Sequence, residues 1–90
     1  MSLTKRQLDI ARAILEVLDQ TREYVMPETA LRPQVNLQVR PLAMQYEFET
    51  VLSLLEAEKC VMCPNPEEAA CRRWHIADMG DVKLRQWKGN

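Results

Sequence analysis

The sequence has very little glycine, a single histidine and no long apolar run. Two glycines and five prolines among 90 residues exclude the low-complexity linkers that join separate folding units. The longest apolar run is far too short to cross a bilayer, so we expect no membrane partner. No basic start leads into an apolar stretch, so we also expect no secretory signal and a cytoplasmic protein.

The chain offers little from which an active site could be assembled. It has one histidine, no Gly-rich phosphate-binding loop, and no serine or cysteine near a base. Asp78 and Asp81 are close in sequence, but the expected role of Asp78 is to cap a helix. We therefore predict a protein that is not an enzyme and that uses no cofactor.

The residues that are present suit one small folded unit. Ninety residues, 47% of them hydrophobic and 6% aromatic, can build one core but not two. A single domain over residues 1–90 is the prediction. Three cysteines are an odd number, which fits reduced thiols in the cytoplasm better than a disulfide framework.

Charge is nearly balanced, with twelve basic against thirteen acidic side chains and a net charge of -1. A nucleic-acid-binding protein usually carries a basic face, so this balance weighs against such a partner without excluding it. Between Pro41 and Glu58 there is no basic residue, whereas this stretch holds Glu47, Glu49, Glu56 and Glu58. Two basic groups lie toward the ends of the chain: Lys5, Arg6 and Arg12, and Arg72, Arg73, Lys83, Arg85 and Lys88.

Two longer helices are predicted from helical spacing of apolar residues. Thr4 begins the first as N-cap, with Gln7 completing a capping box, and the apolar pattern continues to about Gln20. Pro41 opens the other, which closes at Glu58 ahead of a strand. Its apolar stripe consists of Met44, Phe48, Val51, Leu52 and Leu55, thickened by Leu54.

The region between these helices has weaker signals. Pro27 is expected to start a brief helix that ends near Arg32, because Pro33 disfavours helical backbone in the residue before it. After Pro33, apolar and polar residues alternate from Val35 to Val39, which favours an extended segment. A helix through Val35 and Val39 is the other interpretation.

Two strands and a last helix are predicted in the remainder. The strands cover 60–63 and 73–77, and the connection over 64–72 is too long for a tight hairpin turn. Asp78 is expected to cap the following helix and Gly80 to relax its backbone. The apolar contacts of that helix are assigned to Val82, Leu84 and Trp87.

The second half of the chain resembles the winged-helix superfamily. Leu54-Leu55-Glu56-Ala57-Glu58-Lys59-Cys60-Val61 looks like the end of a recognition helix entering its first wing strand. Arg73-Trp74-His75-Ile76-Ala77-Asp78-Met79-Gly80 is similar to the closing wing strand and the turn after it. The resemblance implies an α+β winged helix-turn-helix with three main helices, a two-stranded β wing and a short C-terminal helix. Ala77 departs from the pattern, since a hydroxyl is expected there, and Pro33 departs from a clean second helix.

Several residues would acquire a role in DNA binding if the resemblance holds. Base-edge contacts would fall to the front of the third helix, at Gln45, Tyr46, Glu49 and Ser53. Wing contacts to phosphate would fall to Arg72 and Arg73.

Each of these roles has an ordinary alternative. Glu49 could accept from a cytosine amino group, but together with Glu47 it repels phosphate, so this face is also explained as a solvated surface. Arg72 and Arg73 could instead be neutralised by Glu67 and Glu68 across the loop.

Cys60, Cys63, Cys71 and His75 have a spacing that resembles a zinc site, and three thiolates with an imidazole would form a suitable tetrahedral set. The geometry of a strand argues against it, because Cys60 and Cys63 would point to opposite faces. Cys60 also falls where the fold needs a core residue. A metal site is therefore only a minor alternative.

The sequence thus predicts a small DNA-binding protein, a transcriptional regulator acting as a homodimer through its third helix and wing. The predicted dimer contacts are Leu8, Leu15, Tyr24, Leu84 and Trp87. The alternative is a winged-helix module for protein–protein interaction that does not bind DNA, which the acidic third helix favours.

Overall fold

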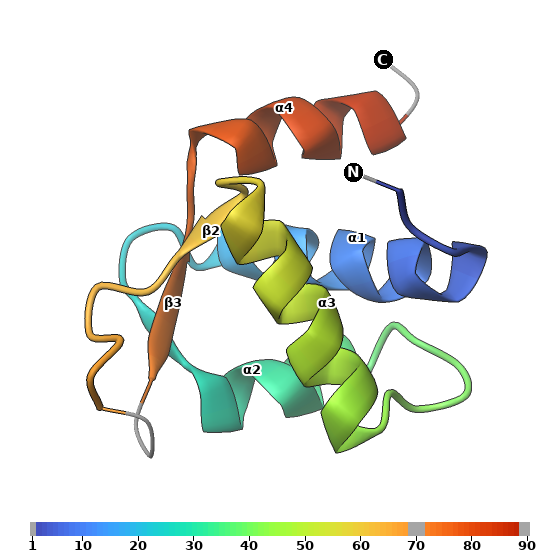
Figure 1. The fold of residues 1–90 in the computed structure, drawn as a ribbon, viewed down its shortest axis with the longest axis horizontal. Helices are drawn as coiled ribbons and strands as arrows, with labels where there is room; N and C mark the ends of the chain where they lie inside the picture. The colour runs from blue at the N-terminus through green and yellow to red at the C-terminus, as the bar shows by residue number, and fades with distance from the viewer. Residues whose placement is uncertain (1, 69–71, 89–90) are drawn as a thin grey trace.

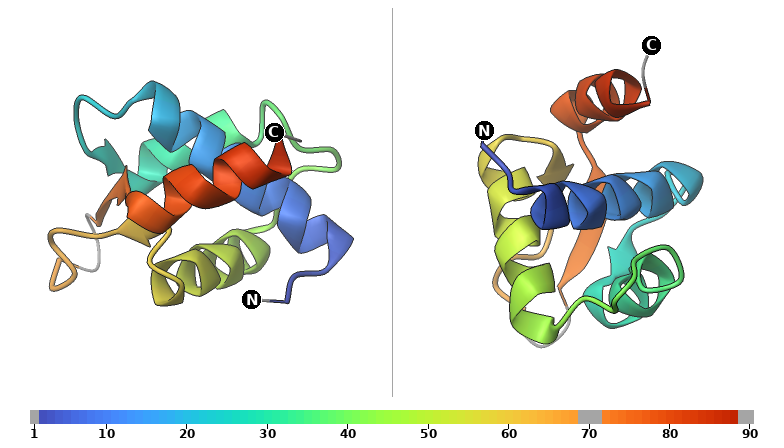
Figure 2. Two further views of the ribbon diagram at one scale, coloured as in Figure 1. Left: turned by 90° about the horizontal axis from the view of Figure 1, so that it is seen from above. Right: turned by 90° about the vertical axis from the view of Figure 1, so that its right-hand side faces the viewer.

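The computed structural model describes residues 2–68 and 72–88. Within them the chain forms four helices and three strands: α1 (Lys5–Gln20), β1 (Met26–Pro27), α2 (Glu28–Val35), α3 (Gln45–Ala57), β2 (Val61–Met62), β3 (Arg73–Ile76) and α4 (Asp78–Trp87). Helix α1 occupies the middle of the molecule and contacts each of the other helices (Figure 1). Helices α4 and α2 lie on opposite sides of it, and the sheet lies at one end (Figures 1 and 2). The predicted α+β class is confirmed.

Helix α1 begins and ends where the sequence predicts. The Gln7 amide donates to Thr4 Oγ1 at 3.0 Å, and the Thr4 amide donates to Gln7 Oε1 at 3.1 Å. This reciprocal pair satisfies two backbone donors that have no partner inside the helix. The buried face is broad because α1 is covered from several sides; it consists of Ile10, Ala11, Ala13, Ile14, Leu15, Val17 and Leu18.

Helix α2 does not end at Arg32 as predicted but continues through Pro33 to Val35. Pro33 lacks the N–H that would bond the carbonyl of Thr29, four residues earlier. Both residues are exposed, so water can satisfy that carbonyl. Burial of Leu31 and Val35, each 0% exposed, holds the helix together across the proline.

The segment between α2 and α3 is a loop and not the predicted extended segment. Val39 is buried, whereas Leu37 is 69% exposed, so the alternation in the sequence does not correspond to one buried face of a strand. Pro41 lies in this loop, after a cis peptide bond with Arg40, and does not open α3. The loop is fixed by Asn36, whose Oδ1 accepts from the Ala43 amide at 2.9 Å.

Three strands form one antiparallel sheet in the order β1-β3-β2. In the register, Met26 pairs with Trp74 and Val61 pairs with Ile76. The sequence predicted the two strands that pair as β2 and β3 but missed β1, which is only two residues long and contains Pro27. A proline fits there because β1 is at the edge of the sheet, where one side of the strand needs no donor.

Helix α3 ends in a turn that uses a left-handed residue. Lys59 has φ 61°, its amide donates to the Glu56 carbonyl at 3.0 Å, and the Cys60 amide donates to the Leu55 carbonyl at 2.8 Å. These two bonds form a Schellman motif, in which glycine is the usual left-handed residue. Leu55 and Cys60 are both fully buried, which supplies the hydrophobic contact of this motif.

Substituting Lys59 with glycine is therefore expected to stabilise the chain by about 0.5–1 kcal/mol, because glycine removes the steric cost of a left-handed backbone. Urea unfolding measures the change. Lys59→Ala is the control, since it removes the same side chain but keeps the Cβ atom. Equal stability of the two variants would show that the backbone at this position is not strained.

Helix α4 starts differently from the prediction. Ala77 is the N-cap and supplies no side-chain cap, while Asp78 is the first helical residue and does not cap. Gly80 lies inside the helix, where it permits close packing and does not relax a turn. A Cβ atom there would lie 2.3 Å from the Cys60 carbonyl oxygen and 2.7 Å from Ile76 Cγ1.

An ion-pair cluster fixes α4 to the end of α1. Arg22 donates to Asp81 at 2.5 Å and also pairs with Asp19. The hydrogen bond from Arg22 lowers the pKa of the Asp81 carboxyl below its ordinary value.

No helix in residues 2–68 and 72–88 is long and apolar enough to cross a bilayer.

Candidate functional site

The exposed face of α3 carries three of the four residues predicted to contact bases in a single row. Gln45, Glu49 and Ser53 follow one another at intervals of four and are all exposed. The opposite face packs into the core through Phe48, Val51, Leu52 and Leu55. Tyr46 is 68% exposed but does not share the four-residue spacing and lies outside this row.

The start of β3 lies beside this row. Glu49, Ser53 and Arg72 line one pocket of about 280 Å³, together with Glu28, Leu52 and Trp74. The Glu28 amide donates to the Arg72 carbonyl at 2.8 Å, and Trp74 Nε1 donates to Glu28 Oε1 at 2.9 Å. These bonds fix the backbone of Arg72 against α2. The pocket therefore brings together Glu49 and Ser53, which were predicted to contact bases, and Arg72, which was predicted to contact phosphate.

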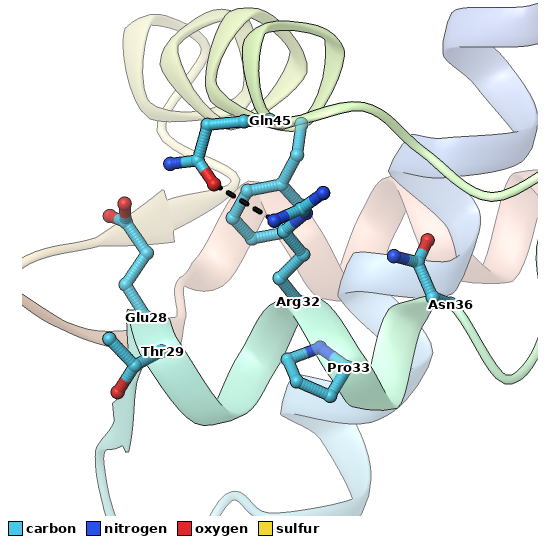
Figure 3. A pocket seen from close by; sticks show the side chains of 7 residues that line it. Glu28, Thr29, Arg32, Pro33, Asn36 and Gln45 are labelled. Carbon is cyan, nitrogen blue, oxygen red and sulfur yellow. Dashed lines mark hydrogen bonds between the residues drawn. The ribbon is translucent and has the colours of Figure 1, made fainter.

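A second pocket, of about 470 Å³, continues the same face between α2 and the start of α3 (Figure 3). Its lining residues are Glu28, Thr29, Arg32, Pro33, Asn36, Gln45 and Phe48. Glu28 lines both pockets, which are therefore neighbours along α3. The depression formed by the two pockets is called here the α3 groove.

Arg32 is the functional candidate that the sequence did not indicate. It projects from α2 across the α3 groove, where its Nη1 donates to Gln45 Oε1 at 3.0 Å and its Nη2 donates to the Ala43 carbonyl at 3.3 Å (Figure 3). Its Nε atom is buried and has no hydrogen-bond partner. This contact could not be predicted, because Pro33 was expected to end the helix at Arg32.

Gln45 in turn donates from Nε2 to Glu49 Oε1 at 2.5 Å. Arg32, Gln45 and Glu49 thus form a chain of side-chain hydrogen bonds across the α3 groove. An arginine can only donate and an ionised glutamate can only accept, so the chain fixes which end of the Gln45 amide faces each neighbour.

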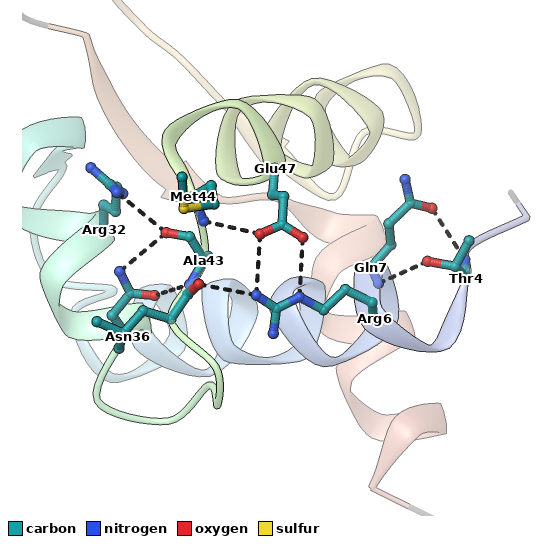
Figure 4. A network of polar contacts seen from close by, with 9 residues as sticks. Thr4, Arg6, Gln7, Arg32, Asn36, Ala43, Met44 and Glu47 are labelled. Carbon is teal, nitrogen blue, oxygen red and sulfur yellow. Dashed lines mark hydrogen bonds and ion pairs between the residues drawn. The ribbon is translucent and has the colours of Figure 1, made fainter.

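Glu47 does not belong to the α3 groove, contrary to the expectation that it adds to the charge of Glu49. Both of its oxygens accept from Arg6 of α1 at 3.1 Å, and Oε1 also accepts from the Met44 amide at 3.0 Å (Figure 4). These hydrogen bonds lower the pKa of the Glu47 carboxyl. The bidentate pair neutralises this charge, so Glu49 is the acidic residue of α3 that lines the groove.

Arg72 and Arg73 are exposed, and within residues 2–68 and 72–88 their side chains make no ion pair with Glu67 or Glu68. The Arg73 amide donates to Asn65 Oδ1 at 3.0 Å, which closes the loop between β2 and β3. Both guanidinium groups are accordingly available to a partner.

The alternative metal site is not assembled by the described residues. Cys60 is buried and Cys63 partly buried, while Cys71 lies outside the described residues. His75 has its Nδ1 2.7 Å from the Ile76 carbonyl oxygen and its Nε2 2.6 Å from the Arg22 carbonyl oxygen. Among the described residues no group of three or more potential ligands could hold a metal ion.

The residues predicted to form a dimer interface are divided between core and surface. Leu15 is 0% and Leu84 5% exposed, so both face the core of their own chain and cannot contact a second copy. Leu8 is partly buried, and Trp87 packs against the core. Tyr24 alone among the five is fully on the surface, at 61% exposure. Helical spacing identified apolar faces correctly but could not tell an internal face from an external one.

Comparison of the chain with protein-family models, with curated proteins and with solved structures gives no significant match.

Proposed function

We propose that this chain is a winged-helix DNA-binding protein in which α3 enters the major groove and the loop between β2 and β3 acts as the wing. The order of elements supports this fold: α2 is followed by α3 after a loop over residues 36–44, and α3 leads into the antiparallel strands β2 and β3. A helix of this kind reads base edges while neighbouring elements hold the phosphate backbone.

The proposal rests on one observation: polar and basic side chains lie together in the α3 groove. Gln45, Glu49 and Ser53 form an exposed row, and basic residues line the groove beside it, with Arg32 on α2 and Arg72 at β3. Base edges require hydrogen-bonding side chains at the centre of an interface, and phosphates require cations at its sides.

The charge of α3 is less unfavourable than its composition indicates. Of the acidic residues in its first turns, Glu47 is paired with Arg6, and Glu49 is the one that lines the groove. Within the groove, Arg32 and Arg72 balance the two carboxylates of Glu28 and Glu49. Arg73 follows Arg72 in the chain, lies outside both pockets and is exposed, so it adds a positive charge that is available to phosphate.

Titration with a random-sequence DNA duplex at about 50 mM and about 200 mM salt tests the proposal. Binding should be measurable at the lower salt and at least about tenfold weaker at the higher salt, because each phosphate contact releases counterions. Absence of binding at about 50 mM salt would contradict the proposal.

A docking module for another protein is the second candidate, and it has its own observation. The loop before α3 and the first turn of α3 expose Leu42, Met44 and Tyr46 at 57%, 58% and 68%. Exposed apolar side chains close together are typical of protein-binding surfaces. Failure to bind DNA at low salt would favour this function. Roles as a transcriptional regulator, a homodimer and a cytoplasmic protein are part of the DNA-binding proposal.

A further inference from the structure

The chain of hydrogen bonds across the α3 groove determines what α3 can offer to a base. Arg32 Nη1 donates to Gln45 Oε1, and Gln45 Nε2 donates to Glu49 Oε1. The carbonyl end of the Gln45 amide is therefore turned toward Arg32 and its amino end toward Glu49. Each end of the Gln45 amide is thus engaged once inside the chain, and the orientation of the amide is fixed.

Glu49 ends the chain of hydrogen bonds and offers an acceptor to a base. One carboxylate oxygen accepts from Gln45, and the other remains available as an acceptor in the pocket shared with Ser53 and Arg72. In the major groove, guanine presents two acceptors and thymine one, so both repel a carboxylate. The adenine amino donor lies between two acceptors, adenine N7 and thymine O4, whereas the cytosine amino donor has an acceptor, guanine O6, on one side only.

We propose, on the basis of the DNA-binding function above, that Glu49 selects a cytosine in the DNA and that Arg32 positions the Glu49 carboxylate through Gln45. The acidic residue at the centre of α3 then serves sequence selection. The negative charge of Glu49 weakens binding to sequences that lack a cytosine at this position. Where a cytosine amino group is present, its hydrogen bond to the carboxylate offsets this loss of affinity. Arg32 is a positioning residue in this scheme, because its contact is with Gln45.

The basic residues beside the row make such an arrangement workable. Arg72 lines the same pocket as Glu49, and Arg73, the next residue in the chain, is exposed outside this pocket. These two supply attraction to phosphate that does not depend on sequence, while Glu49 supplies the difference between sequences. The two contributions can therefore be measured separately.

Selection of bound duplexes from a pool with a randomised centre tests the inference. The wild-type chain is expected to enrich cytosine at one position of each site, and replacing that C·G pair is expected to weaken binding about ten- to a hundredfold. Glu49→Gln should move the preference at this position toward adenine, because a glutamine can pair with both adenine groups. It should leave the salt dependence nearly unchanged.

Two further variants separate positioning from charge. Arg32→Ala is expected to reduce the ratio of the affinity for duplexes with C·G at this position to the affinity for duplexes with another pair there. Loss of a phosphate contact alone would weaken both affinities equally and leave this ratio unchanged. Glu56→Gln is the matched control for Glu49→Gln, since Glu56 is an exposed glutamate of α3 that lines neither pocket of the groove. It should keep the full cytosine preference.

The outcomes distinguish this inference from the proposed function. Salt-dependent binding without any cytosine preference, or an unchanged preference in Glu49→Gln, would overturn the inference and leave the DNA-binding function standing. A cytosine preference that survives intact in Arg32→Ala would overturn the positioning role of Arg32. No binding to any duplex at about 50 mM salt would overturn both proposals.

Discussion

Replacing Gly80 with alanine is expected to destabilise the folded chain by about 2–3 kcal/mol, although alanine is the better helix former by about 1 kcal/mol. The added Cβ atom would lie 2.3 Å from the Cys60 carbonyl oxygen, well inside any normal contact. That carbonyl cannot easily move, because it accepts from the Ala77 amide at 2.9 Å and follows the turn that ends α3. The strain must therefore be relieved by moving α4 away from the sheet.

Urea unfolding and thermal unfolding measure this loss, and the melting temperature is expected to fall by about 10–20 °C for a domain of this size. Gln86→Ala is the matched control, since Gln86 is an exposed residue of the same helix and its substitution raises helix propensity without a clash. A Gly80→Ala variant as stable as this control would show that α4 is not held close to Cys60.

The parts of the fold that could be predicted are those with strong local signals. The capping box at Thr4 and Gln7 fixed the start of α1, and the apolar stripe from Phe48 to Leu55 fixed the body of α3. Pro33 and Pro41 led to wrong predictions of helix boundaries, because the effect of each proline depends on the tertiary structure around it. Pro33 is accommodated in a helix held by its buried side, and Pro41 lies in a loop that other elements fix.

Strand β1 could not be predicted for a related reason. Two residues carry no detectable alternation, and Met26 becomes part of a strand only because Trp74 lies opposite it. Pairing between residues so far apart in the chain depends on the whole fold.

The candidate site was predictable in its residues but not in its electrostatics. Helical spacing was enough to place Gln45, Glu49 and Ser53 on one face. The pairing of Glu47 with Arg6 joins residues separated by 41 positions, and the contact of Arg32 with Gln45 depends on the course of the loop between them. Adding charges along the sequence therefore overestimated the acidity of the α3 groove.

Reversing the charge of both Arg72 and Arg73 to glutamate is expected to weaken binding to a random DNA duplex about a hundredfold at about 50 mM salt. Each phosphate contact contributes about 0.9 to the slope of log affinity against log salt, so loss of two contacts should make the slope shallower by about two. The fold should survive, because both side chains are exposed and the bonds to Glu28 and Asn65 use only the backbone of these arginines. Circular dichroism checks this directly.

A matched control makes the result specific to this face of the protein. Lys83→Glu combined with Arg85→Glu changes the net charge by the same amount on α4, outside the α3 groove. If DNA affinity depended only on net charge, both double variants would lose the same affinity. The geometry of the α3 groove predicts a much larger loss for the Arg72 and Arg73 pair, since Arg72 lines the pocket that Glu49 and Ser53 share. Equal losses would show that DNA attraction is spread over the surface, and that this groove is not the contact.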